Sequence, residues 1–222
     1  MSELKFYIKC DKVPHLMMYY RFEFGNVKMY FPARKGGVSE GPFSGLNLSF
    51  RVGDEDEKVK TNRRIFFEKI GLEESKLVTL NQIHSNIVRI VDKPQRLEGD
   101  GLITFTKHLA LGVYVADCVA LYLVGKDYIG ILHVGRRGLE NGIIEEAFKL
   151  IEPPECAVMS PSICPTCYEV DLWEGIEERL KKHGVERIFN PKICTYENPE
   201  QFFSYRRDKG KTGRHLAIIT QI

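Results

Sequence analysis

The sequence predicts an α+β fold with mixed β-sheets, built as a single domain over residues 1–222. Three observations predict it. Short apolar stretches typical of strands outnumber the helical ones. The helical patterns are scattered between the strands and do not alternate regularly with them, which argues against a βαβ repeat. The chain has 222 residues, of which 43% are hydrophobic, and this is enough for one core.

Strands are predicted where apolar residues run for about four to eight positions between turn residues. These stretches are residues 4–9, 17–24, 27–31, 77–80, 87–91, 101–105, 109–115, 119–124, 128–134 and 156–159. Gly25-Asn26 has the composition of a hairpin turn between the second and third strands. We expect the terminal segment, residues 202–220, to form a further hairpin around a basic turn.

Three segments carry apolar residues at helical spacing. The first covers residues 55–70, with Asp54 as its N-cap and Gly71 at its end. The second starts near Gly138 and is stopped by Pro153-Pro154. The third covers residues 172–183 and ends at a glycine.

Charge and composition exclude several classes of protein. The net charge is +2 with both signs interspersed, so we expect no general attraction to nucleic acid or membranes. The longest apolar runs, such as residues 128–134, are too short to span a bilayer. The N-terminal residues carry charges and lack a cleavage site, which predicts a cytoplasmic protein. In that reducing compartment its six cysteines are expected to be free, metal-bound or catalytic.

Three residues with metal-binding side chains stand at predicted strand ends. His84 follows one strand, Cys118 lies between two, and His133 is near the end of a very apolar one. Two imidazoles and a thiolate suit zinc and leave a fourth position for water or substrate, as in catalytic zinc sites. The three are far apart in sequence, so the pattern leaves open that each histidine is an ordinary core or surface residue and Cys118 a buried small side chain.

Cys164-Pro-Thr-Cys167 is a second candidate motif. A Cys-x-x-Cys pair is redox-active or forms half of a structural zinc site. The zinc interpretation needs a second pair, and the remaining candidates, Cys156 and Cys194, stand alone. The sequence therefore favours a loop with two unpaired thiols.

Basic residues gather in three runs, Arg136-Arg137, Arg206-Arg207 and the segment 209–214. Such runs commonly form a solvated face. Arginine also grips phosphate oxygens in bidentate geometry, and Arg137 precedes a predicted helix start where an anion is stabilised. Arg137 is therefore a candidate anion ligand.

At these residues the chain resembles the laccase-domain family, formerly described as multicopper polyphenol oxidases and now as purine nucleoside phosphorylases. The matching motifs are Gly36-Gly-Val-Ser-Glu-Gly-Pro-Phe, Leu46-Asn-Leu, Val52-Gly-Asp, Asn62-Arg-Arg, Asn81-Gln-Ile-His, Asp100-Gly-Leu-Ile-Thr, Ala116-Asp-Cys, His133-Val-Gly-Arg-Arg-Gly-Leu, Pro161-Ser-Ile-Cys-Pro-Thr-Cys-Tyr-Glu-Val, Cys194-Thr and Phe202-Phe-Ser-Tyr-Arg-Arg-Asp with Thr212-Gly-Arg. The resemblance implies packed mixed sheets with helices outside. It also implies zinc held by His84, Cys118 and His133.

The resemblance further implies phosphorolysis of adenosine, inosine, guanosine and methylthioadenosine, together with adenosine deamination. Phosphorolysis needs cations for phosphate and stabilisation of the departing base. Arg137, Arg64 and Arg206 are the candidates for holding phosphate, and Asn47 is a further candidate for binding substrate. One zinc site with its water can serve both reactions, and the candidate catalytic residues are His84, Cys118, His133 and Arg137.

Several positions depart from the family pattern. The family usually has Trp at Arg136, Gly at Ser85, and His at Lys35 and Arg51, and its Gly-Pro-x-Ile-Gly-Pro-Cys-Cys-Tyr loop is altered at residues 160–168. The metal ligands are unchanged. We therefore expect this chain to share the metal site of the family more closely than its substrate preference.

Three alternative functions remain open. A multicopper laccase needs roughly ten imidazoles and the chain has six histidines, although copper can occupy the same three ligands in place of zinc. A cysteine hydrolase would use Cys118 as nucleophile and His133 as base. A non-enzymatic, zinc-stabilised nucleotide-binding protein would use the metal only for folding. The sequence leaves the oligomeric state open.

Overall fold

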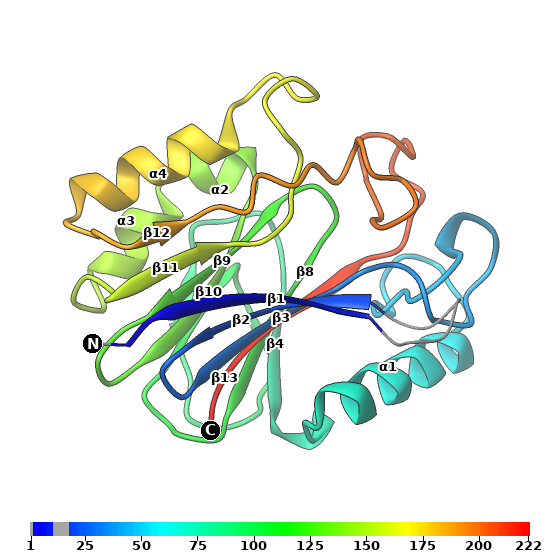
Figure 1. The fold of residues 1–222 in the computed structure, drawn as a ribbon, viewed down its shortest axis with the longest axis horizontal. Helices are drawn as coiled ribbons and strands as arrows, with labels where there is room; N and C mark the ends of the chain where they lie inside the picture. Colours follow the sequence, from blue (N-terminus) through cyan, green and yellow to red (C-terminus); the bar gives the residue numbers. More distant parts are fainter. Residues whose placement is uncertain (1, 11–17) are drawn as a thin grey trace.

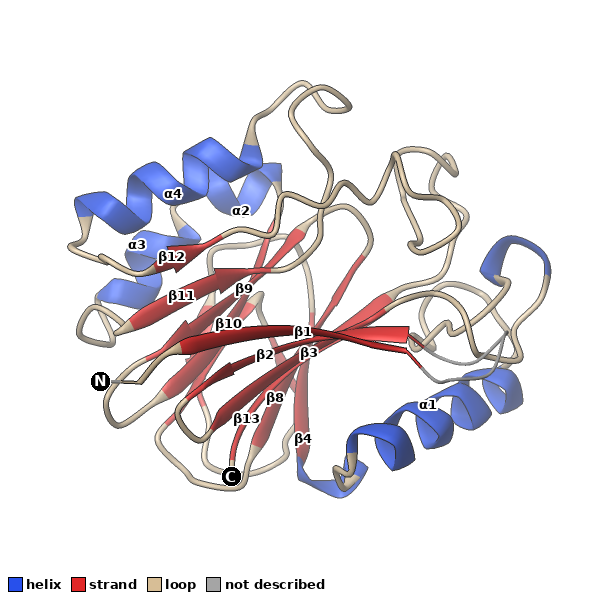
Figure 2. Cartoon of the chain, viewed as in Figure 1, coloured by secondary structure: helices blue, strands red, loops and turns tan. Residues whose placement is uncertain are grey.

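Two β-sheets pack face to face at the centre of the fold, and helices cover both outer faces (Figure 1). The computed structural model describes residues 2–10 and 18–222. Both sheets contain parallel and antiparallel pairs, as Figure 2 lets the reader follow. The predicted α+β class, with packed mixed sheets and outer helices, is confirmed.

The first sheet has the strand order β1-β2-β3-β13-β8-β4-β6 within the described residues. Its strands are β1 (Leu4–Cys10), β2 (Met18–Phe24), β3 (Val27–Pro32), β13 (His215–Gln221), β8 (Ala110–Val115), β4 (Leu77–Asn81) and β6 (Leu97–Glu98). The pairs from β1 to β8 are antiparallel, and β4 is parallel to both of its neighbours.

The second sheet has the order β12-β11-β9-β10-β7-β5. Its strands are β12 (Ile188–Phe189), β11 (Cys156–Met159), β9 (Val119–Val124), β10 (Ile129–Val134), β7 (Gly101–Thr104) and β5 (Val88–Ile90). β9 and β10 are buried along their whole length, because the first sheet covers one face and helices cover the other. This burial explains why their sequences are continuously apolar and do not alternate.

The helices are α1 (Asp56–Ile70), α2 (Arg136–Glu140), α3 (Ile143–Phe148) and α4 (Leu172–Lys182), with short 3₁₀ turns at Gly41–Phe43 and Glu74–Lys76. Phe66 and Phe67 of α1 pack on the first sheet. Ile144 of α3 and Ile176 of α4 pack on the second, on the opposite side of the molecule (Figure 1). Each amphipathic helix thus buries its apolar stripe against one sheet. None of the helices in the described ranges is long and apolar enough to cross a membrane.

Two details of the predicted helices differ in the structure. Glu55, and not Asp54, is the N-cap of α1, because the Asp54 carboxylate accepts hydrogen bonds from the Ser39 hydroxyl (2.6 Å) and the Asn47 amide (2.9 Å). The helix expected from Gly138 is two helices, α2 and α3. The chain breaks at Gly142, whose φ of 77° lies in the left-handed region that glycine adopts most readily.

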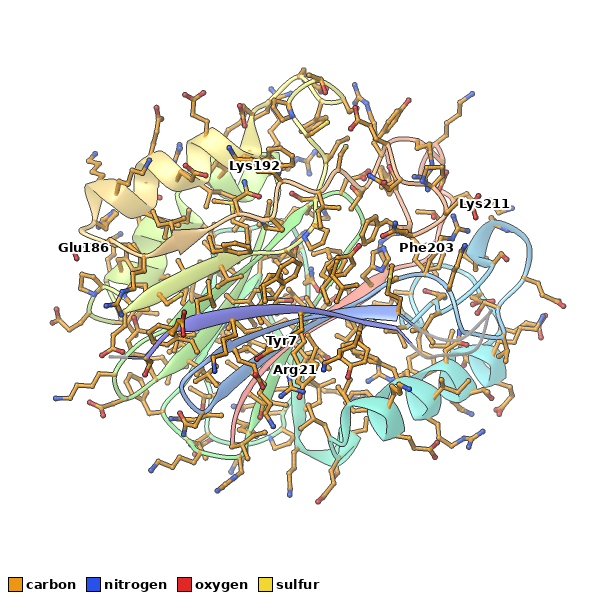
Figure 3. The ribbon with its side chains drawn as sticks, viewed as in Figure 1. Tyr7, Arg21, Glu186, Lys192, Phe203 and Lys211 are labelled. Atoms are coloured by element: carbon orange, nitrogen blue, oxygen red, sulfur yellow. The ribbon has the colours of Figure 1, made fainter. Side chains whose placement is uncertain are left out.

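The predicted C-terminal hairpin is wrong. Residues 202–204 are not in a strand, and His215–Gln221 forms β13 in the middle of the first sheet, paired with β3 and β8. Phe202 and Phe203 are fully buried and pack around the His215 ring, so their apolar character reflects core packing. Phe203 is buried whereas Lys211 in the same segment is exposed (Figure 3). The short strands β6 and β12 were not predicted, and the predicted start of β2 at Met17 lies outside the described residues.

Candidate metal centre and active-site cavity

A cavity of about 780 Å³ opens where several strand ends and loops meet. Its lining comes from the loop 49–52 before α1, the loop after β4, the β8–β9 turn, the start of α2, the loop 160–171 before α4 and the segment 205–214 before β13. The last of these is drawn orange to red in Figure 1 and lies beside the loops at this edge of the sheets. The segments are distant in sequence, so the cavity forms only in the folded chain.

Three metal-binding side chains meet in this cavity. A ligand atom from each of His84, Cys118 and His133 lies within 4.8 Å of the other two. The two imidazole rings are 4.9 Å apart between centroids and nearly perpendicular, at 76°. His84 is exposed, Cys118 is half-buried and His133 is buried, so the group spans the wall of the cavity from its inner to its outer side.

Asp100 connects the two histidine segments. Its carboxylate is fully buried and lies 2.8 Å from Nδ1 of His133. It also accepts hydrogen bonds from the backbone N–H groups of His84 (3.1 Å) and Ser85 (2.6 Å), and from the Ser85 hydroxyl (2.8 Å). Burial alone would raise the pKa of Asp100, but these hydrogen bonds outweigh it and lower the pKa to about 2. A carboxylate that fixes a histidine ring is the usual outer partner of a metal ligand.

This contact determines which nitrogen of His133 faces the cluster. Because Nδ1 is used by Asp100, Nε2 is the nitrogen available for a metal ion. Burial alone would lower the pKa of His133. The neighbouring Cys118 sulfur and Asp100 carboxylate outweigh this effect and raise the pKa to about 9. The pKa of His84 is lowered, first because part of its ring is shielded from water and then by the neighbouring His133 and cationic side chains.

Two residues of the site have left-handed backbone conformations that non-glycine residues seldom adopt. His84 has φ 58° and Asp117, next to Cys118, has φ 88°. Asp117 is held there by hydrogen bonds from the Thr195 and Ser204 hydroxyls, at 2.7 and 3.0 Å. Such strain persists only where the surroundings determine the conformation, and it is concentrated at functional sites.

Gly135 gives the Cys118 thiol its space. A Cβ atom at Gly135 would lie 2.7 Å from Cys118 Sγ, closer than real contacts allow. The glycine at the start of α2 is therefore required by the neighbouring sulfur and not by its own backbone angles.

The cavity wall is strongly cationic. Six basic side chains line it, Arg51, Arg136, Arg137, Arg206, Lys209 and Arg214. Of these, Arg206 pairs with Glu169 (2.8 Å) and Arg136 with Glu140 (2.8 Å). No ion pair between described residues involves Arg137 or Lys209. These two cations therefore keep their charge available for an anion in the cavity.

Aromatic side chains stand beside the cations. Arg206 lies over the ring of Tyr168 (5.3 Å) and Arg214 lies over the ring of Tyr205 (5.4 Å). Arg214 is half-buried, and burial lowers its pKa. Both tyrosines line the cavity, so it offers flat aromatic surfaces next to positive charge.

The other predicted binding residues have different positions. Arg137 and Arg206 line the cavity. Arg64 does not; it is exposed on α1, 3.5 Å from Glu68, because that helix covers the far face of the first sheet. Asn47 is also outside the lining. It is fully buried, and its side-chain oxygen accepts a hydrogen bond from the backbone N–H of Arg214 (3.0 Å), so it positions the cavity wall without forming it.

Sequence reasoning missed Asp100, Arg214 and the two tyrosines as parts of the site. The signal for Asp100 was a carboxylate placed directly before a fully apolar strand, where only a buried partner explains it. Arg214 belongs to the basic run 209–214, but nothing local places it at the cavity, because the fold of the segment before β13 brings it there.

The other histidines in the described part of the chain do not gather with the cluster. His183 contacts Phe148 edge-on (4.8 Å between ring centroids), His215 is buried in the core, and His108 is exposed in a turn. Within residues 2–10 and 18–222, the other group of potential metal ligands consists of cysteines only. The described structure therefore lacks the histidine clusters that several copper ions would need.

Comparison with curated proteins shows close relatives. The purine nucleoside phosphorylase of Corynebacterium glutamicum is 33% identical over 232 residues, which cover 87% of this chain and 94% of that protein. The purine nucleoside phosphorylase of Haemophilus influenzae is 30% identical over 231 residues (87% and 94%). That of Aquifex aeolicus is 32% identical over 200 residues (78% and 93%).

Solved structures share the fold. YlmD from Geobacillus stearothermophilus matches with a TM-score of 0.88 and 26% identity, over 96% of this chain and 98% of that one. The Bacillus licheniformis protein YfiH has a TM-score of 0.84 and 24% identity, over 97% and 99%. The family model described as multi-copper polyphenol oxidoreductase laccase matches residues 28–171 and 170–221. The resemblance drawn from the motifs is thus confirmed, and the chain belongs to the multi-copper polyphenol oxidoreductase laccase family.

Proposed function

We propose that this protein is a zinc-dependent purine nucleoside phosphorylase that also deaminates adenosine. One observation carries the proposal: a single cavity holds a cluster of two histidines and a cysteine beside a cationic wall. The names of the curated relatives support the phosphorylase activity. We expect residues 1–222 to act as one domain in the cytoplasm, with purine nucleosides and phosphate as partners.

The donor set of His84, Cys118 and His133 fits zinc. Two imidazoles and one thiolate leave a position open for water or substrate, and the Asp100 carboxylate supplies the outer contact typical of zinc histidines. Copper can compete for the same donors. When bound, zinc supplies a Lewis acid and lowers the pKa of water, which suits both departure of a base and deamination.

The cationic wall suits inorganic phosphate. In phosphorolysis a phosphate oxygen bonds to C1′ of the ribose while the bond from C1′ to the purine nitrogen breaks, and the base leaves with its electron pair and takes up a proton. We propose that Arg137 and Lys209 bind phosphate, because neither is neutralised by an acidic partner among the described residues. Arg206 and Arg214 add charge to the same wall. Arg64 is not part of this proposal.

The tyrosines suit the purine ring. Tyr168 and Tyr205 line the cavity, and each ring already carries an arginine on one side. We propose that the base of adenosine, inosine, guanosine or methylthioadenosine stacks on this aromatic surface. Stacking recognises any purine, in keeping with a broad substrate range.

The decisive experiment incubates the purified protein with adenosine, with and without phosphate, and separates the products by chromatography. We expect adenine and ribose 1-phosphate only when phosphate is present, and inosine under both conditions. Cys118→Ala should abolish both reactions, whereas Arg137→Leu should reduce phosphorolysis about 10²-fold or more and spare deamination. Hypoxanthine release from inosine without phosphate and without zinc would refute the proposal. A protein with no turnover but zinc-dependent stability would favour the non-enzymatic alternative.

A cysteine hydrolase is the second candidate, and one observation favours it. Cys118, His133 and Asp100 form a chain of nucleophile, base and orienting carboxylate. The exposed His84 beside them has no role in such a triad, whereas it completes a metal site. Metal analysis separates the two: stoichiometric zinc that disappears in Cys118→Ala supports the ligand role, and alkylation of Cys118 by iodoacetamide in a metal-free, active protein supports the nucleophile.

A further inference from the structure

A second group of thiols lies outside the cavity. Sγ atoms of Cys164, Cys167 and Cys194 all lie within 4.8 Å of one another, although Cys194 is distant in sequence from the other two. Cys164 and Cys194 are buried and Cys167 is half-buried. The fold thus supplies the third cysteine that the Cys-x-x-Cys motif lacked in the sequence.

Backbone hydrogen bonds hold the two cysteine loops side by side. The N–H of Ser162 donates to the Ile193 carbonyl (3.1 Å), and the N–H of Thr195 donates to the Ser162 carbonyl (3.0 Å). The N–H of Cys164 donates to the Cys194 sulfur (3.3 Å) across this junction. The sulfurs are therefore brought together by a defined backbone contact.

The two loops also have the same local shape. The Cys164 sulfur receives a hydrogen bond from the backbone of Cys167, three residues later. The Cys194 sulfur receives hydrogen bonds from the backbones of Tyr196 and Glu197, two and three residues later. Backbone N–H groups directed at sulfur favour the thiolate, the form in which cysteine binds metals; they contribute to the lowered pKa of Cys164, whereas burial leaves the pKa of Cys194 raised.

Glu197 occupies, in the second loop, the place that Cys167 has in the first. Its Oε1 lies 3.7 Å from the Cys167 sulfur. The Cys167 thiol donates this contact to the carboxylate, and loss of the thiol proton on metal binding would free both groups as donors. The three sulfurs already form a compact group, and Glu197, which contacts Cys167, would complete a set of three sulfurs and one oxygen that suits tetrahedral zinc if its carboxylate turned toward the other two sulfurs.

We propose that Cys164, Cys167, Cys194 and Glu197 form a second, structural zinc site. A disulfide between two of the cysteines would leave the third thiol and the carboxylate unexplained. The ion would join the loop 160–171 to the segment 192–198. The first of these loops contributes Tyr168 to the cavity, so the second site would stabilise the cavity wall without contacting the bound substrate.

The test measures zinc per chain in the full-length protein, purified with a reducing agent and without chelator. We expect Cys167→Ser to lose one zinc ion relative to the parent, whether or not Cys118→Ala has removed another. Cys156→Ser is the matched control, because Cys156 is a buried thiol in β11 outside both clusters, and it should keep the parental zinc content. Independent loss at the two positions distinguishes this site from the cavity site.

X-ray absorption on the Cys118→Ala variant identifies the ligands even if Cys167→Ser does not fold. We expect about three sulfurs at about 2.3 Å from zinc. Glu197→Gln should weaken zinc binding and leave the sulfur count unchanged. Unchanged zinc content in a folded Cys167→Ser variant would overturn the proposal. So would a zinc-free Cys118→Ala protein whose mass shows a disulfide within residues 164–194.

Discussion

Asp100→Asn is the sharpest test of how the metal centre is built. The substitution preserves size but replaces one carboxylate oxygen by an NH₂ group. The Oδ2 atom faces the backbone N–H and the hydroxyl of Ser85, while Oδ1 faces His133 Nδ1 and the N–H of His84. Either orientation of the amide therefore sets one donor against a buried backbone donor.

The magnitude follows from these contacts. If the NH₂ group turns toward Ser85, the partly buried backbone N–H of Ser85 loses its acceptor, at a cost of about 1–3 kcal/mol. If it turns toward His133, the ring must accept at Nδ1 and carry its proton on Nε2, the atom that faces the metal. Loss of such an outer partner lowers metal affinity by about 10–100-fold. We expect that decrease together with about 1–3 kcal/mol of lost stability.

Zinc affinity is measured by competition with a chromophoric chelator, and stability by thermal unfolding. The expected fall in Tm is roughly 2–12 °C for a chain of this size. Ser85→Ala is the control, since it removes only the hydroxyl and should cost about 1 kcal/mol or less. The reasoning fails if Asp100→Asn binds zinc within about threefold of the parent and melts at the same temperature.

Three further predictions follow from other positions. Gly135→Ala should displace the Cys118 thiol and reduce zinc affinity in the same chelator competition. Gly138→Ala is the control and should bind zinc normally, because its new Cβ would lie no closer than 3.4 Å to any neighbour. Burial lowers the pKa of His215 to about 3, whereas a histidine in the unfolded chain has a pKa of about 6.5. The unfolded state therefore takes up this proton first, and the free energy of unfolding decreases as the pH falls below about 6.5, by about 2 kcal/mol at pH 5. Urea unfolding of His215→Gln should show a correspondingly flatter pH dependence. Asn62→Ala should lower the free energy of unfolding in urea by about 2–4 kcal/mol. The side chain of Asn62 is fully buried; its oxygen accepts a hydrogen bond from the Val38 N–H (2.7 Å), and its NH₂ group donates to other groups of the loop before α1. A loss below about 1 kcal/mol would contradict that role.

The fold was predictable where local sequence and tertiary structure agree. The apolar runs of β9 and β10 are long and unbroken, and burial on both faces requires that composition. Phe202 and Phe203 have the same composition, yet they are core residues of a loop around His215. Hydrophobicity reports burial, and it reports strand pairing only when the partner strand is known.

The candidate metal-ligand cluster was predictable for a different reason. Residue types and strand-end positions marked His84, Cys118 and His133 as candidates but left their convergence open, and the family resemblance supplied the three as a set. The residues around them carry common side chains whose roles depend on position. Arg64 and Arg137 look equivalent in sequence, but α1 lies on the outer face of the first sheet and α2 begins at the cavity.

The central role of Asp100 also shows why this centre depends on the second sheet. Asp100 immediately precedes β7, which pairs with β10, and the His133 N–H donates to the Asp100 carbonyl (2.7 Å) while its ring meets the carboxylate. One residue therefore fixes both the backbone and the ring of His133, and its carboxylate also holds the loop that carries His84. The His133 ring and the backbone that carries His84 are thus positioned before any ion binds. Metal binding then has little ordering cost left for these two, and the Cys118 turn is itself held by the hydrogen bonds to Asp117.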